Sequence, residues 1–334
     1  MKAVLYDRFG GPEVLYVGQL PRPEPAPGEV LVRVRAFSVN GGELLARSGR
    51  TRLITGSKFP QRTGIDFTGE IAALGTDTGT GTGTSAYAVG DRVWGTAGRS
   101  PKGTAAEYVA VPADRIGRVP DGLDLVEAAA LPGVGTTAVT ALRDKAALRP
   151  GERLLVRGAA GGVGSVAVQL GRARGAEVTG LARAANLDFV RELGALEAVD
   201  HRTVRPADLG RFDVVLDTVG TELPAYRALL RPGGRMVTIT VDPARVAVTL
   251  GYLAASAVLH GRGRVRAFSG NPKRALLDDV ARHVTDGALR PVVDTVFPLE
   301  ETAAAHRALE AGGVRGKFVV RVGPPTAEGD KHRA

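Results

Sequence analysis

The sequence predicts an α/β protein in which a β-rich, barrel-like domain is combined with a doubly wound parallel sheet. Three observations support this prediction. Short β-like runs such as 30–36 and 106–111 are separated by Gly and Pro throughout the first third of the chain. From residue 153 onward strands and helices alternate, which is typical of βαβ units. The length of 334 residues is sufficient for two domains that each bury a core.

The predicted elements follow this division. In the first third, a Gly- and Thr-rich segment at 75–84 is interpreted as a surface loop, because it contains nothing to bury. The Ala-rich segment 125–142 favours helix, although Pro132 and Gly133 interrupt it. Alternating strands and helices are then predicted at 153–157, 164–174, 177–181, 186–193, 198–200, 212–217, 223–230 and 234–239. The last predicted elements are a helix at 273–285, a strand at 291–297, a helix at 300–311 and a strand at 317–322.

The composition excludes several kinds of site. The chain has no Cys, so it can form no disulfide, cysteine nucleophile, iron–sulfur cluster or thiolate zinc site. None of its five His has a metal-ligand spacing such as HxxxH. We therefore predict no metal site, and only a zinc site assembled from distant His and carboxylates stays open.

Charge and hydropathy restrict the partners. The formal net charge is +9, but Arg is spread along the chain and no basic cluster is interleaved with aromatic residues. We interpret this charge as a solvated surface and do not expect nucleic acid as a partner. The apolar run at 250–259 is too short to span a membrane. Residues 1–7 are typical of a strand rather than of a signal peptide, so we expect a cytoplasmic protein.

One Gly-rich stretch has the arrangement of a dinucleotide site. The strand at 153–157 ends in a Gly-rich turn, and an apolar helix begins immediately after it. Helix N-terminal N–H groups favour phosphate, and positions without side chains allow the pyrophosphate to approach. Ala159 occupies the place of the first glycine in an A-x-G-x-x-G pattern, and a structural turn without ligand is the alternative. The predicted cofactor contacts are Ala160, Gly161, Gly162, Val163 and Gly164.

The end of the next strand indicates the choice of cofactor. An Asp or Glu at this place binds the ribose 2′-OH of NAD, whereas an Arg accommodates the 2′-phosphate of NADP. Here the strand at 177–181 leads into Ala182 and Arg183, with no carboxylate. Because Arg183 can pair with a phosphate through two N–H groups, the prediction is NADPH. The alternative is a solvated surface role for Arg183.

These features resemble the medium-chain dehydrogenase/reductase superfamily, specifically its zinc-free quinone oxidoreductase (zeta-crystallin-like) branch. The matching motifs lie at 1–4, 11–15, 27–32, 39–40, 64–69, 90–93, 130–132, 135–138, 158–164, 217–220 and 316–317. The resemblance implies a GroES-like catalytic domain made of residues 1–122 and 271–334, with a Rossmann dinucleotide-binding domain, 123–270, between them. It also implies a homodimer formed through the Rossmann domain, for which residues 264–268 are the candidate edge strand.

The resemblance implies metal-free chemistry as well. Asn40 stands where zinc-dependent relatives have a Cys ligand, and the four-cysteine lobe is absent. Without a Lewis acid to polarise an alcohol or ketone oxygen, the expected reaction is hydride transfer from NADPH to the conjugated C=C of an enone, quinone or enoyl substrate. Such a substrate needs hydrogen bonds to its enolate oxygen and a proton for its α-carbon, which water can supply. The alternatives are an NADPH-binding regulatory or nucleic-acid-binding protein with lost catalysis, and an alcohol dehydrogenase with a metal site free of cysteine.

The resemblance also assigns roles to individual residues. Asn40 would hydrogen-bond the cofactor ribose or the substrate oxygen, or else cap a loop as an Asx turn. Thr137 would contact the nicotinamide carboxamide, or else bond its own helix backbone. Lys317 would approach the cofactor, with a solvated strand-edge lysine as the alternative, and His201 falls where relatives have a Tyr beside the adenosine phosphate. Asn40 and Thr137 are the candidate catalytic residues, and Val219 and Ile239 are further cofactor-binding candidates.

The substrate pocket departs from the family pattern. Several bacterial quinone reductases carry two Tyr after the Asn, and those places are Leu45 and Thr51 here. The candidate pocket residues are therefore Leu45, Trp94 and Tyr252, without an identified side-chain proton donor. Asp66 is expected to tether a barrel loop rather than to act as an acid. This departure leaves room for an enone or enoyl reductase and does not name the substrate.

Overall fold

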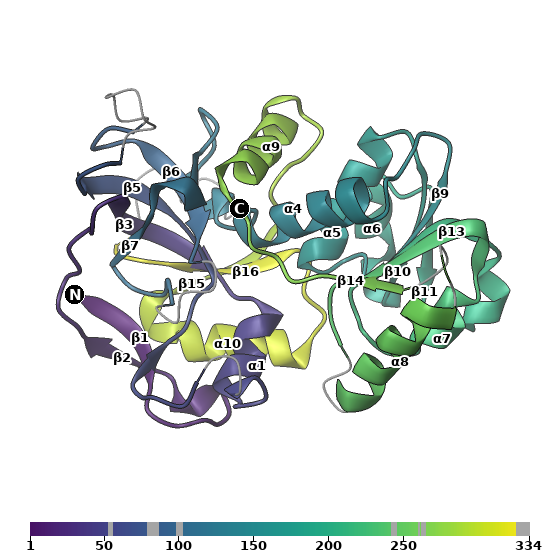
Figure 1. Cartoon of the computed structure of the whole chain (residues 1–334), viewed down its shortest axis with the longest axis horizontal. Coiled ribbons are helices and arrows are strands. Elements are labelled where there is room, and N and C mark those ends of the chain that lie inside the picture. Colours follow the sequence, from purple (N-terminus) through teal and green to yellow (C-terminus); the bar gives the residue numbers. More distant parts are fainter. Residues whose placement is uncertain are drawn as a thin grey trace.

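In the computed structural model the chain forms two lobes that lie side by side (Figure 1). The structure describes residues 1–52, 56–78, 87–97, 103–241, 246–259, 261 and 265–324. One lobe combines the first strands of the chain with the last described ones, and the other contains the strands between them. Most of the loop interpretation for 75–84 falls on residues 79–86, which lie outside the described part.

The first lobe is built on a seven-stranded sheet in which both ends of the sequence meet. Its order is β15 (Val293–Pro298), β16 (Lys317–Arg321), β3 (Glu29–Ser38), β5 (Asp66–Leu74), β6 (Arg92–Thr96) and β8 (Ile116–Arg118), and β7 (Tyr108–Pro112) also pairs with β3. A smaller sheet contains β2 (Tyr16–Gln19), β1 (Lys2–Tyr6) and β4 (Gln61–Arg62). Strand β16 runs antiparallel to β3 with Val319 opposite Ser38. This pairing places the start of β16 beside the segment that follows β3.

The second lobe is a six-stranded parallel sheet. Its order is β11 (Glu197–Asp200), β10 (Glu177–Ala182), β9 (Arg153–Arg157), β12 (Phe212–Asp217), β13 (Leu230–Thr238) and β14 (Val265–Ala267). Leu154 and Val156 of β9 face one hydrophobic cluster and Leu155 faces another, so the strand is buried on both sides. Burial on both faces explains the continuous apolar runs of these strands. The strand order reverses between β9 and β12, and in open α/β sheets ligands bind outside the carboxyl ends of the strands at such a reversal.

Helices cover both faces of this sheet. The helices are α4 (Pro132–Val139), α5 (Gly162–Ala173), α6 (Leu187–Glu192), α7 (Leu223–Arg227) and α8 (Val246–Leu259). Helix α4 begins with Pro132 at its first turn, where a missing N–H costs nothing, and a π-helical turn continues it to Lys145. The Ala-rich segment is thus two helices, because α3 (Leu125–Ala128) ends before Pro132. None of the described helices is long and apolar enough to cross a bilayer.

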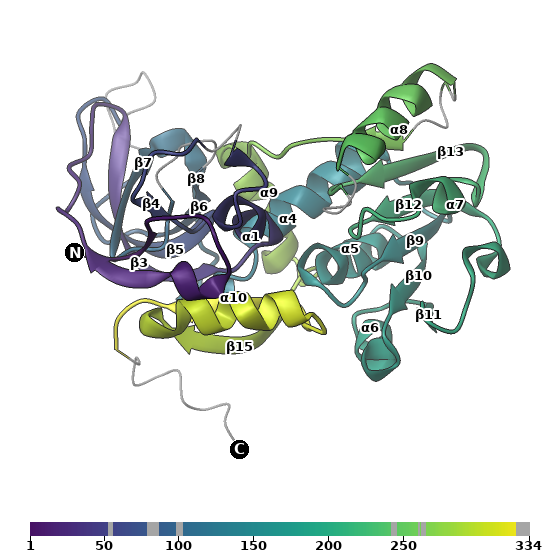
Figure 2. The same cartoon turned by 90° about the horizontal axis from the view of Figure 1, so that it is seen from below.

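The remaining helices complete the first lobe and join it to the second. Helix α1 (Gly41–Arg47) follows β3 and lies beside α10 (Thr302–Ala311) in both views (Figures 1 and 2). Helix α9 (Arg274–Thr285) packs against α4 and β8. The predicted fold class, a GroES-like barrel with a doubly wound parallel sheet, is confirmed.

Candidate active site

The phosphate loop connects β9 to α5 and is shaped by its glycines. Gly158 has a φ of +71°, so the left-handed turn falls one residue before Ala159, the place that the sequence pattern indicated. A Cβ at Gly164 would lie 2.0 Å from the Gly158 carbonyl oxygen, so only glycine allows the helix to start this close to the turn. Helix α5 begins at Gly162 with Gly161 as its N-cap. Its first N–H groups have no intrahelical acceptor, which suits a pyrophosphate.

The first lobe contacts this loop directly. The Gly316 N–H donates to the Ala160 carbonyl at 2.8 Å, and Gly161 and Gly316 form an isolated parallel bridge. The Lys317 side chain passes over the loop, because a Cβ at Gly162 would lie 2.7 Å from Lys317 Cδ. The start of β16 is therefore fixed to the phosphate loop, and Lys317 extends from this contact into the first lobe.

Lys317 ends in a buried polar network at the start of α1. Its ammonium donates to the Asn40 Oδ1 at 2.7 Å and to the Val39 carbonyl at 2.5 Å, and only 6% of the residue is exposed. Burial lowers the pKa of Lys317, while the charges of Asp66 and Glu43 oppose that shift. The alternative of a solvated strand-edge lysine is wrong. Its approach to a cofactor stays a prediction.

Asn40 is held at both ends of its carboxamide. Its Nδ2 donates to the Ser38 carbonyl and to Glu43 Oε1, each at 3.1 Å, and lies 3.3 Å from Asp66 Oδ2. Since acceptors surround Nδ2 and an ammonium faces Oδ1, the orientation of the amide is fixed. Asn40 is also the N-cap of α1, a position where Asn is favoured. Asn40 was predicted to bind the ribose or the substrate, but its Nδ2 and its Oδ1 both form hydrogen bonds within the protein.

Two buried carboxylates lie behind Asn40. Asp66 was expected to tether a barrel loop, and it accepts from the Ser38 backbone N–H and hydroxyl at 2.8–2.9 Å, which links β5 to β3. Glu43 Oε2 accepts from the Thr63 hydroxyl at 2.9 Å and from the Gly64 N–H at 3.1 Å. Burial and the charge of Asp66 raise the pKa of Glu43 to about 7, against the opposing hydrogen bonds from Asn40 and Thr63.

A buried His–Arg pair continues the network toward α10. His306 is fully buried, its Nδ1 lies 3.2 Å from an Arg47 N–H group, and its Nε2 lies 3.8 Å from Glu43 Oε2. Because Arg47 can only donate, Nδ1 is the acceptor and Nε2 carries the proton that faces Glu43. Burial, with a smaller contribution from Arg47, lowers the pKa of His306 to about 3, so the ring is neutral. Arg47 also bonds the Gly10 carbonyl and pairs with Glu310.

Sequence reasoning did not identify Glu43, Arg47 or His306. Only one local signal pointed to any of them. Glu43 stands three residues after Asn40, the spacing of a capping box, and its carboxylate does accept from the Asn40 backbone N–H at 3.2 Å. His306 and Arg47 are brought together by the packing of α10 on α1, which no local pattern indicates.

Thr137 lies on α4, the helix next to α5. Its hydroxyl donates to the Gly133 carbonyl at 2.7 Å, which is the backbone bond considered as the alternative. A hydroxyl that donates to its own helix still has lone pairs that can accept from a carboxamide N–H. A Cβ at Gly133 would lie 2.7 Å from Asp66 Oδ2, so the first turn of α4 closes over the network around Asn40.

The predicted adenosine end lies where β10 and β11 finish. A Cβ at Gly312 or Gly313 would lie 3.0 or 3.2 Å from the Arg183 guanidinium, so the loop after α10 passes beside this side chain. His201 Nδ1 lies 2.8 Å from the Ala182 carbonyl, one residue before Arg183. Sequence reasoning did not identify Arg315, which bonds Asn186 Oδ1 at 2.9 Å and the Ala185 carbonyl at 2.7 Å. Arg315 therefore fixes the loop after α10 to the segment that follows β10, and Arg183 lies beside the same loop.

Val219 and Ile239 follow the carboxyl ends of neighbouring strands. Val219 comes after β12 and is 42% exposed, and the Ile239 N–H donates to the Asp217 carbonyl at 3.1 Å. A buried ion pair of 2.5 Å between Arg157 and Asp217 fixes the ends of β9 and β12 beneath them. Both candidates lie at the carboxyl ends of the strands, on the same side of the sheet as the phosphate loop.

The pocket candidates are not brought together. Leu45 is half-buried on α1, next to the network. Trp94 is fully buried in the core with Val119 and Leu277 and has no surface to offer a substrate. Tyr252 lies on α8, which both views place away from α1, and packs against the cluster that contains Leu155 (Figures 1 and 2). The structure contradicts the pocket assignment of Trp94, because the side chain is fully buried, whereas the assignment of Tyr252 stays a prediction.

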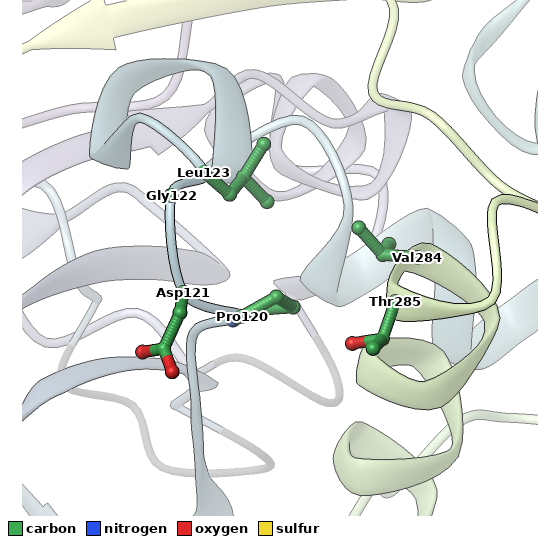
Figure 3. Close-up of a pocket in the computed structure, with 6 residues that line it drawn as sticks. All are labelled: Pro120, Asp121, Gly122, Leu123, Val284 and Thr285. Carbon is green, nitrogen blue, oxygen red and sulfur yellow. The ribbon is translucent and has the colours of Figure 1, made fainter.

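A pocket of about 470 Å³ lies elsewhere, between the segment before α3 and the end of α9 (Figure 3). It is lined by Pro120, Asp121, Gly122, Leu123, Val284 and Thr285. None of these residues belongs to the phosphate loop or to the polar network around Asn40, and we assign the pocket no part in the site.

Comparisons with known proteins agree with this arrangement. The family model of the alcohol dehydrogenase GroES-like domain matches residues 26–121, and that of zinc-binding dehydrogenases matches residues 193–320. The mouse mitochondrial NAD(P)H oxidoreductase RTN4IP1 is 32% identical over 96% of this chain and 89% of its own length. This chain belongs to the medium-chain dehydrogenase/reductase superfamily.

Solved structures agree with the quinone oxidoreductase branch of this superfamily. The quinone oxidoreductase from Coxiella burnetii matches with a TM-score of 0.85 and 30% identity, over 97% of this chain and 99% of its own. A mycobacterial protein complexed with NADPH matches with a TM-score of 0.78 and 25% identity, over 96% and 100%. This superfamily member is an oxidoreductase of the quinone oxidoreductase type that uses a nicotinamide cofactor.

Proposed function

We propose that this protein is a zinc-independent, NADPH-dependent reductase of a conjugated C=C or quinone substrate. The observation that carries the proposal is the Lys317 ammonium, which is buried against Asn40 at the end of a side chain that crosses the phosphate loop. An ammonium at the junction of the two lobes supplies positive charge where reduction of an enone develops a negative oxygen.

The residues of the site have different roles in this reaction. NADPH, when bound, would supply the hydride for the β-carbon of the substrate, and the electrons of the C=C bond would then reside on the carbonyl oxygen. An ammonium has three N–H donors, and among the described residues Asn40 and Val39 accept two of them. The third is available to the substrate oxygen, and water supplies the proton that completes the α-carbon. Thr137 would accept from the carboxamide and so orient the nicotinamide ring.

The preference for NADPH over NADH rests on two arginines. In the described part of the chain, the Arg183 guanidinium makes no ion pair or hydrogen bond, and it lies beside the loop that Arg315 fixes. A 2′-phosphate accepted by Arg183 would complete a charge-assisted pair. The mycobacterial relative with bound NADPH is consistent with this choice.

Zinc independence rests on the donor set. Zinc takes thiolate, imidazole or carboxylate ligands. The chain has no Cys, and its described residues contain no group of three His, Asp or Glu that could hold a metal. At the place of the Cys ligand, the Asn40 oxygen faces a Lys ammonium, and a divalent cation there would be repelled. The residues present do not fit zinc.

A homodimer through the second lobe is part of the proposal. Strand β14 is an edge of the described sheet, and residues 262–264 before it are not described. The neighbouring helix α8 exposes apolar side chains at Val248, Val258 and Leu259. Pairing of two β14 edges would cover these side chains, and the mass in solution measured by light scattering tests this dimer.

The cytoplasmic location stays a prediction, and the mouse relative is named as mitochondrial.

A panel assay tests the reaction. Purified protein with NADPH should consume the cofactor when an enone or a quinone is added, and a chelator should leave the rate unchanged. Tight NADPH binding without turnover across the panel would instead favour a binding protein with lost catalysis. Turnover of alcohols that depends on added zinc would overturn the metal-free assignment.

A further inference from the structure

Glu43 is surrounded by hydrogen-bond donors on both of its oxygens. Oε1 accepts from the Asn40 backbone N–H at 3.2 Å and from Asn40 Nδ2 at 3.1 Å. Oε2 accepts from the Thr63 hydroxyl and the Gly64 N–H at 2.9 and 3.1 Å. Four donors match the four lone-pair positions of a carboxylate and leave no acceptor for a carboxyl proton unless the Thr63 hydroxyl turns round. The arrangement is therefore built for ionised Glu43.

Charged and titratable groups face Glu43 from each neighbouring element. Asp66 from β5 is the like charge, and Lys317 from β16 is the opposite charge. Neutral His306 from α10 faces it with Nε2, and Arg47 from α1 lies behind that ring. Burial and, to a smaller extent, the charge of Glu43 raise the pKa of Tyr6 on β1. Burial, together with the like charge of Asp66, opposes the ionisation that the four donors support, so the two protonation states are close in free energy.

We propose that Glu43 is a positioning residue, which as a carboxylate holds the Asn40 carboxamide against the Lys317 ammonium and on protonation loosens that hold. The role rests on the proposed function, in which Lys317 contacts the substrate oxygen. Two steps connect them: Glu43 bonds both nitrogens of Asn40, and Asn40 Oδ1 accepts from Lys317.

Protonation of Glu43 changes the strength and the number of the hydrogen bonds that its carboxylate accepts. Bonds to an ionised acceptor are roughly twice as strong as neutral ones. A protonated Glu43 keeps only neutral bonds to Asn40 and requires Thr63 to become an acceptor. The Asn40 amide is then free to tilt toward Asp66, and Lys317 loses its fixed partner. With its pKa raised to about 7, Glu43 makes this change close to neutral pH.

A substitution at Thr63 alters the titration midpoint of Glu43 and leaves Asn40 and Lys317 unchanged. Thr63→Val keeps the shape and removes the hydroxyl, whose bond to the carboxylate is stronger than its bond to the neutral acid, so the titration midpoint of Glu43 should rise. Thr68→Val is the matched control, since Thr68 is a fully buried Thr of the same lobe that donates to the Leu125 and Ala36 carbonyls. The control should leave the midpoint unchanged.

The experiment measures three midpoints on the whole protein. Carbon-13 NMR of labelled Glu carboxyl groups, assigned with Glu43→Gln, gives the ionisation of Glu43. Nitrogen-15 NMR gives the Asn40 side-chain amide against pH, and steady-state kinetics give the acid limb of kcat for NADPH oxidation with a quinone or enone. We expect all three midpoints to coincide near neutral pH in the wild type and to rise together in Thr63→Val.

Each result separates the two proposals. An Asn40 amide signal that does not follow the Glu43 titration overturns the positioning role, and so does a flat profile of kcat where Glu43 titrates. Coinciding NMR midpoints in a protein that turns over no acceptor would leave the positioning of Asn40 by Glu43 standing and overturn the proposed reaction. A merely structural Glu43 would alter stability in its variants without moving these midpoints.

Discussion

The two ends of the candidate site, the phosphate loop and the polar network around Asn40, consist of different chemical groups. The phosphate loop consists of backbone and glycine within one stretch, 158–164, between β9 and α5. The polar end consists of buried side chains from α1, β5, α10 and β16, held by charge-assisted bonds. A backbone site tolerates side-chain changes that add no bulk, whereas a buried charge network depends on every member. The two ends should therefore fail in different ways.

Replacement of Lys317 is the strongest test of the polar end. Lys317→Met keeps the length of the side chain and removes the ammonium, which leaves Asn40 Oδ1 without its donor and two carboxylates without compensation. We expect kcat to fall roughly 10²–10³-fold. Lys273→Met is the control, because Lys273 is exposed and paired only with Asp114 among the described residues. A variant of Lys317 with unchanged kcat would remove the ammonium from the reaction.

Added bulk is the corresponding test of the backbone end. Gly164→Ala places a Cβ 2.0 Å from the Gly158 carbonyl oxygen, so the loop must shift. We expect roughly hundredfold weaker NADPH binding, about 3 kcal/mol, measured by the fluorescence of the bound cofactor. Gly251→Ala in α8 meets no atom within 4 Å and serves as the control. Equal affinity in Gly164→Ala would show that the cofactor does not use this loop.

The stability of the polar end should depend on pH through two groups of opposite sign. The pKa of Glu43 is raised from 4.5 to about 7, so its contribution to stability is complete below pH 4.5 and is lost as pH rises through 7. The pKa of His306 is lowered from 6.5 to about 3, so its contribution is complete above pH 6.5 and is lost as pH falls through 3. The two effects oppose each other at intermediate pH.

Glu43→Gln isolates the first of these groups. Between about pH 5 and about pH 8, the wild type should lose about 3 kcal/mol of unfolding free energy relative to this variant. Urea unfolding at both pH values measures the difference, and exposed Glu301→Gln is the control. A difference that does not change with pH would contradict the buried, raised pKa of Glu43.

The smallest expected effect sharpens the cofactor assignment. Arg183→Ala should cost about 2 kcal/mol of NADPH binding, the size of one charge-assisted contact, and leave NADH binding nearly unchanged. Arg205→Ala, an exposed arginine paired with Asp208, is the control. Equal losses for both cofactors would exclude a 2′-phosphate contact at Arg183.

The comparison also explains what could be predicted from the sequence. The phosphate loop, Arg183 and the alternation of strands and helices are local patterns, and each of them has a counterpart in the structure. The network around Asn40 joins segments that local patterns do not connect, so His306 and Arg47 were not identified. Burial is also not local: Trp94 is a candidate pocket residue in the sequence, whereas packing against Val119 and Leu277 buries it in the structure.

The bond between Asn40 and Lys317 spans 277 positions of the sequence. The second lobe draws its strands from the continuous stretch 153–267, so its sheet can form as soon as that stretch leaves the ribosome. The first lobe must wait for β15 and β16 before the ammonium reaches Asn40, and until then Asp66 and Glu43 lack their positive partner. Long-range closure of this kind slows folding, so the second lobe should mature before the first lobe during synthesis.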